Sequence, residues 1–73
     1  MLDEKYLLSK KFELYSNVYE KYVAKRTFIN VEIIGGKPIV SLEINHGSLT
    51  LSHIKTNKQL EDLYLCLSDK SLI

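Results

Sequence analysis

The feature that most constrains this chain of 73 residues is a change of hydrophobic period near Arg26. Before Arg26, apolar and aromatic side chains recur at steps of four and three residues, which is the spacing of one face of an α-helix. After it, three short runs alternate apolar with polar residues, as β-strands do. A helical pattern then returns from residue 58 to residue 67. The order of these periods predicts a single α+β domain over residues 1–73, arranged α-β-β-β-α.

We expect the first helix to cover about residues 3–26. Asp3 suits an N-cap, and Lys25 and Arg26 fall in the last turn, where cations interact favourably with the negative end of the helix dipole. No glycine or proline interrupts this segment. Its apolar stripe consists of Leu8, Phe12, Tyr15, Tyr19 and Tyr22.

The middle of the chain predicts three strands, at about residues 27–34, 39–45 and 48–53. Pairing Ile34 with Ile39, and Ile44 with Leu49, places the alternating apolar residues on one face, whereas a slip by one residue would scatter them. We therefore expect a three-stranded antiparallel meander with residues 39–45 in the centre. Its apolar face would consist of Ile29, Val31, Ile33, Val40, Leu42, Ile44, Leu49 and Leu51.

The last element is predicted by a capping motif. Thr56 is followed three residues later by Gln59, which matches the capping box that opens a helix. We expect this helix at about residues 57–68. Both helices should pack on the apolar face of the meander.

The residue types that perform catalysis or bind metals are sparse. Cys66 is the only cysteine, and His46 and His53 fall near opposite ends of the third predicted strand, too far apart to share a metal ion. Glu32 and Glu43 would lie on one open sheet face, where like charges keep a sheet soluble. We therefore expect no enzyme activity, no cofactor and no metal site.

The same sequence makes a membrane partner unexpected. No apolar run approaches the length of a membrane span, and the N-terminal residues MLDEKYLLSKKF lack the apolar core of an export signal. We expect a cytoplasmic protein.

The length of the first predicted helix suggests where a partner would bind. A helix over residues 4–25 would be about 33 Å long at ~1.5 Å per residue, whereas a seven-residue strand spans only about 23 Å. The overhang would hold either Tyr6, Leu7 and Leu8 or the end of the helix with Tyr19 and Tyr22, and exposed aromatic surface usually marks a contact. We expect Tyr15, Tyr19 and Tyr22 to contact the partner. The chain is thus predicted to be a small non-catalytic protein-interaction or regulatory module, of adaptor or inhibitor type, that acts through this helix. Its partner would be another protein or a second copy in a homodimer.

A competing interpretation rests on topology. The order helix, three strands, helix is similar to the double-stranded-RNA-binding domain, which implies RNA contacts from the first helix and from a lysine-rich start of the second. At that place the chain reads Lys55-Thr56-Asn57-Lys58, followed by Glu61 and Asp62, without consecutive lysines. Nucleic acid is therefore the less favoured partner. The residues that would contact it are Lys10, Lys11, Lys25, Arg26, Lys55 and Lys58.

Overall fold

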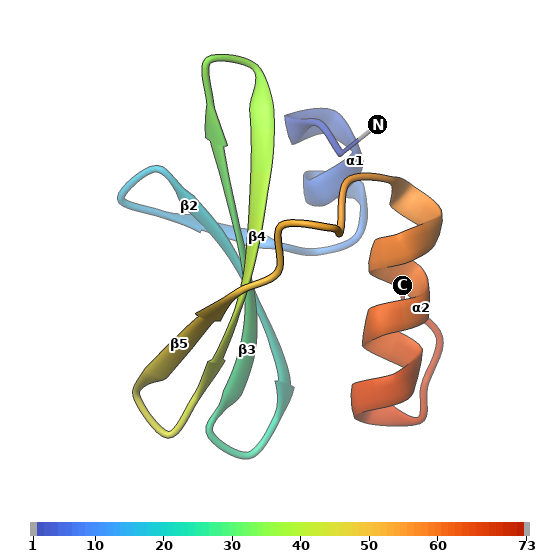
Figure 1. The fold of residues 1–73 in the computed structure, drawn as a ribbon. Coiled ribbons are helices and arrows are strands. Elements are labelled where there is room, and N and C mark those ends of the chain that lie inside the picture. Colours follow the sequence, from blue (N-terminus) through green and yellow to red (C-terminus); the bar gives the residue numbers. More distant parts are fainter. Residues whose placement is uncertain (1, 73) are drawn as a thin grey trace.

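The computed structural model describes residues 2–72, which form an antiparallel sheet with two helices on one side of it (Figure 1). The five strands follow one another across the sheet in the order β1-β2-β3-β4-β5. The α+β class predicted from the sequence is therefore confirmed. The elements are α1 (Glu4–Ser9), β1 (Glu13–Tyr15), β2 (Val18–Ala24), β3 (Thr27–Ile34), β4 (Lys37–Ile44), β5 (Gly47–Thr50) and α2 (Asn57–Ser68).

The predicted helix over residues 3–26 is wrong, and so is the three-stranded meander. Asp3 does cap a helix, since its Oδ1 accepts from the Tyr6 amide at 2.9 Å, but that helix ends at Ser9. Residues 13–24 form the hairpin β1–β2 around Ser16 and Asn17, whose φ angles are 49° and 69°. Valine and tyrosine favour strands over helices. The predicted stripe is therefore not one face of the structure, because Tyr19 points to the helix side of the sheet whereas Tyr15 and Tyr22 point to the other side.

The β3–β4 hairpin is tighter than predicted, with a two-residue turn at residues 35–36. The β4–β5 hairpin has a two-residue turn, as predicted, but at residues 45–46 instead of 46–47. Both residues of each turn have positive φ, as type I′ turns require. Ile34 therefore pairs with Lys37 instead of Ile39, and Ile44 pairs with Gly47 instead of Leu49. Each register differs from the prediction by two residues, which leaves every side chain on its predicted face.

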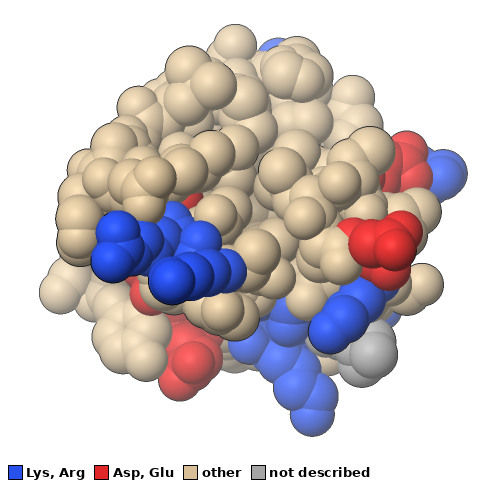
Figure 2. Space-filling view, turned by 90° about the horizontal axis from the view of Figure 1, so that it is seen from below, with Lys and Arg blue, Asp and Glu red and all other residues tan. Residues whose placement is uncertain are grey.

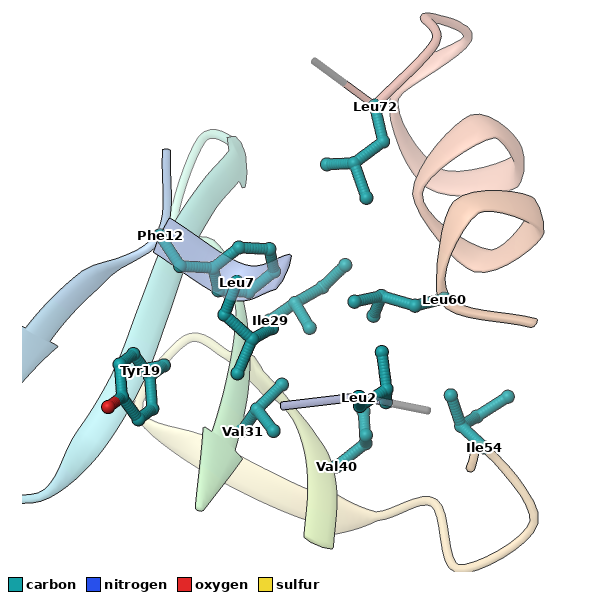
Figure 3. Close-up of a cluster of buried hydrophobic side chains, with 10 residues drawn as sticks. All are labelled: Leu2, Leu7, Phe12, Tyr19, Ile29, Val31, Val40, Ile54, Leu60 and Leu72. Carbon is teal, nitrogen blue, oxygen red and sulfur yellow. The ribbon is translucent and has the colours of Figure 1, made fainter. Parts of the chain in front are cut away.

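The core lies between the sheet and the two helices (Figure 3). Leu7 of α1 and Leu60 of α2 cover sheet residues that are fully buried, and residues near both chain ends complete the cluster. Burial of this apolar surface is the main force that holds α1 and α2 to the sheet. The core consists of Leu2, Leu7, Phe12, Tyr19, Ile29, Val31, Val40, Ile54, Leu60 and Leu72.

The second helix agrees with its prediction. The Thr56 hydroxyl accepts from the Gln59 amide at 3.1 Å, and the Gln59 side chain accepts from the Thr56 amide at 3.1 Å, so the capping box is closed. The helix ends where Asp69 adopts a left-handed conformation with φ of 60°. Neither helix within residues 2–72 is long and apolar enough to cross a membrane.

Candidate functional site

The face of the sheet that points away from α1 and α2, here called the outer face, is not covered by any element of residues 2–72 (Figure 1). The strand registers align its side chains in rows across the sheet. One row runs through Tyr15, Val18, Glu32 and Ile39. The next runs through Glu13, Glu20, Asn30, Ser41 and Thr50, and the third through Tyr22, Phe28, Glu43 and Ser48.

Two exposed tyrosines stand on this face. Tyr15 is 54% exposed and Tyr22 is 59% exposed. Tyr22 lies directly opposite Phe28, and their rings meet edge to face with centroids 5.6 Å apart at 72°. This contact restricts the orientation of the Tyr22 ring. Aromatic side chains held in this way are typical of protein contact surfaces.

The charge of the outer face is strongly one-sided. This face carries four carboxylates and one cation, which belong to Glu13, Glu20, Glu32, Glu43 and Lys37. Glu13 lies directly opposite Glu20, an arrangement that destabilises a sheet. The pair is therefore not explained by folding stability. The face presents negative potential to any approaching molecule.

Two hydrogen bonds order polar groups on the outer face. The Tyr15 hydroxyl donates to Glu13 Oε2 at 3.1 Å, and Asn30 Nδ2 donates to Glu43 Oε1 at 3.2 Å. The bond to Glu13, with the negative charge of that carboxylate, raises the pKa of the Tyr15 phenol above its usual value. The Tyr15 phenol thus stays neutral at physiological pH.

Tyr19 lies on the opposite face of the sheet. Its side chain is only 5% exposed and packs in the core, where its hydroxyl donates to Glu4 of α1. This hydrogen bond is the main reason that the pKa of Tyr19 is raised, and burial adds to it. Of the three tyrosines predicted as contacts, the structure therefore brings Tyr15 and Tyr22 to one surface, on β1 and β2, and separates Tyr19 from them.

The six basic residues of the competing interpretation are spread over the molecule. Lys25 and Arg26 form the β2–β3 turn, at the opposite end of the molecule from the start of α2, where Lys55 and Lys58 lie (Figure 1). Lys58 also pairs with Asp62 at 3.0 Å. In Figure 2 the blue side chains form separate groups with acidic side chains between them.

Lys10 and Lys11 follow α1, beside Lys21 of β2. The Lys21 ammonium donates to the Lys10 carbonyl at 2.9 Å. Burial, together with the positive charge of Lys11, lowers the pKa of Lys21. This local cluster of cations lies on the helix side of the sheet, because Lys21 is opposite Ile29 in the register.

A cleft of about 730 Å³ extends the acidic surface beyond the outer face. It lies between the start of α1 and the β3–β4 turn, and Glu32 borders both the cleft and the outer face. Asp3 and Glu4 add two more carboxylates to its lining. Its apolar walls include Leu14 and Ile34.

Residue types suited to chemistry remain scattered. Among residues 2–72 no three His, Cys, Asp or Glu side chains converge as metal ligands would. His46 lies in the β4–β5 turn, His53 follows β5, and Cys66 is exposed on α2. The outer face thus remains the candidate site, and it is suited to contact.

Comparisons of this chain with protein-family models, with curated proteins and with solved structures each found no match. The candidate site therefore rests on this molecule's own geometry. Several of its members were missed by the sequence prediction, namely Glu13, Val18, Glu20, Phe28, Ile34 and Ile39. The available signal was the pair Ser16-Asn17 between two alternating runs, which is a hairpin pattern.

Proposed function

We propose that this protein is a small non-catalytic interaction module that binds a basic segment of a partner protein on the outer face of its sheet. The observation that carries the proposal is the open face itself, on which exposed Tyr15 and Tyr22 stand among four glutamates and one lysine. The proposed contact surface therefore lies on strands of the sheet, with Tyr15 on β1 and Tyr22 on β2, and not on an aromatic helix.

The aromatic groups would supply most of the binding free energy. Tyrosine is enriched among the few residues that dominate protein interfaces, because it buries a large apolar area and loses few rotatable bonds. The ring of Tyr22 is already held by Phe28, and the hydroxyl of Tyr15 by Glu13. Such preorganisation lowers the entropy that binding must cost.

The carboxylates would select the partner. A negative face attracts lysine and arginine side chains, speeds their encounter and rejects acidic surfaces. The same charges repel the phosphates of RNA and DNA, so base stacking on these tyrosines is disfavoured. Because exposed charges are screened by salt, binding to this face should weaken as ionic strength rises.

The proposal is tested by titrating the labelled protein with a 12-residue peptide of arginine, leucine and tyrosine and following backbone amide shifts by NMR. We expect the shifts to map to the outer face, and Tyr22→Ser to weaken binding at least tenfold. Leu65→Ser is the matched control, since Leu65 is also exposed but lies on α2. Duplex RNA and a glutamate-rich peptide serve as competing probes. Absence of peptide binding, or shifts around Lys25 and Lys55 with RNA, would overturn the proposal.

A further inference from the structure

Strand β5 ends the sheet with one side of its backbone open. All four of its residues, Gly47–Thr50, are exposed. The Leu51 amide donates to the Val40 carbonyl at 2.8 Å. Leu49, two residues before Leu51, lies opposite Leu42 of β4. Hydrogen-bonded pairs alternate along an antiparallel ladder. The backbone groups of Leu49 and Leu51 therefore face β4, and those of Ser48 and Thr50 face outward.

This edge is short, with four residues, but it lacks three other features that normally prevent strands from pairing. Native edge strands are protected by charges, proline, bulges or very short length. β5 has no charged residue and no proline, and its pairing with β4 is regular. The other edge strand, β1, differs because it has three residues, includes Glu13 and follows Lys11.

An apolar strip borders the open edge on the helix side of the sheet. Leu49 is 61% exposed, the highest value among the large apolar side chains, and its neighbour Ile44 is 47% exposed. Figure 2 looks onto the end of the molecule where the β4–β5 turn lies and shows a broad area without charged side chains there. Apolar surface beside an unpaired edge is suited to a second strand.

We propose that β5 pairs with β5 of a second copy, antiparallel, about a two-fold axis at Leu49. In this register Ser48 of each copy lies opposite Thr50 of the other. The outward N–H and C=O groups of both residues are then all hydrogen-bonded across the two strands. The two Leu49 residues then lie opposite one another in a non-hydrogen-bonded position, with Cα atoms about 4.5 Å apart. A second copy is the occupant that the pattern favours, because the register that pairs every outward group also places the most exposed leucine against itself.

The dimer would join the five strands of each copy into one continuous sheet. Residues opposite each other in an antiparallel pair project to the same face, so both outer faces would lie on one side of this sheet. A partner with two basic segments could then be held at two sites, which strengthens binding without new contacts. The dimer itself does not depend on the proposed function.

The experiment is sedimentation equilibrium over protein concentrations from about 1 µM to 1 mM, with circular dichroism to verify the fold of each variant. Thr50→Pro removes an outward N–H and leaves the β4–β5 ladder intact, since proline is tolerated at such edge positions. We expect Thr50→Pro and Leu49→Lys each to raise the dimer dissociation constant at least tenfold. Leu14→Lys is the matched control, because Leu14 is an exposed leucine on the same face at the other edge.

A cysteine pair tests the register in a background with Cys66→Ser. Leu49→Cys should form a disulfide-linked dimer when oxidised glutathione accepts the two electrons of the thiols, whereas Ser48→Cys should not. A wild-type protein that is monomeric throughout the concentration range would overturn the proposal. A dimer that survives Thr50→Pro, or that is disrupted by Leu14→Lys, would overturn it equally.

Discussion

Truncation of one leucine on α2 should remove most of the stability of this protein. Of the residues of α2, Leu60 is the one that is fully buried, with 0% exposure, and it packs among core residues from α1 and the sheet. Helix α2 has no other fully buried anchor. Leu60→Ala therefore tests whether the attachment of α2 depends on this single side chain.

The magnitude follows from the burial. Leu60→Ala removes three carbon atoms at about 0.8 kcal/mol each, or roughly 2.4 kcal/mol of transfer free energy. The cavity left in a close-packed core raises the cost to about 3 kcal/mol. A domain of this size has a net stability of only about 3–5 kcal/mol. About 0–2 kcal/mol would remain, so between about 3% and half of the variant molecules should be unfolded at 25 °C without any denaturant.

The assay is urea unfolding followed by circular dichroism and by the fluorescence of the five tyrosines. The control is Leu65→Ala, which changes the same side chain on the same helix at a position that is 49% exposed. We expect it to cost less than about 1 kcal/mol, because little apolar area is lost. A loss below about 1 kcal/mol for Leu60→Ala, or equal losses for the two variants, would refute the reasoning.

Two further predictions concern the hydrogen bonds of the helices. Burial, the hydrogen bond to Glu61 and the charge of Glu61 raise the pKa of Tyr6 above its ordinary value of 10.0. The neutral Tyr6 phenol therefore stabilises the fold fully below pH 10, and this stabilisation is lost as the pH rises through the raised pKa. The free energy of unfolding should fall above pH 10, and Tyr6→Phe should flatten that fall in urea titrations; an unchanged slope would contradict this. Thr56→Ala removes the hydroxyl of the capping box and should lower the free energy of unfolding by about 1 kcal/mol in the same assay. Thr50→Ala, on exposed β5, should lower it by less.

Local signals predicted the second half of the fold well. The capping box at Thr56 and Gln59 acts within four residues, so its geometry needs no tertiary context. The alternation in β3 and β4 assigned faces that survive in the structure, with Val31 opposite Val40 in the core. The register itself was wrong by two residues, because the turn at residues 35–36 is tighter than predicted and the turn at residues 45–46 lies one residue earlier than predicted.

The sequence by itself determined which residues alternate, where the last helix begins and that acidic groups line one face of the central strands. Only the tertiary structure decided the fate of residues 13–24, since their apolar spacing is compatible with a helix and with a hairpin. The hairpin is formed because β2 pairs with β3 along its length and sends Tyr19 under α1. The pairing of β2 with β3 is local, but the burial of Tyr19 under α1 depends on how the helix packs on the folded sheet, which the spacing of apolar residues does not encode. It is this pairing that brings Tyr15 and Tyr22 to the open acidic face and leaves β5 at an unprotected edge.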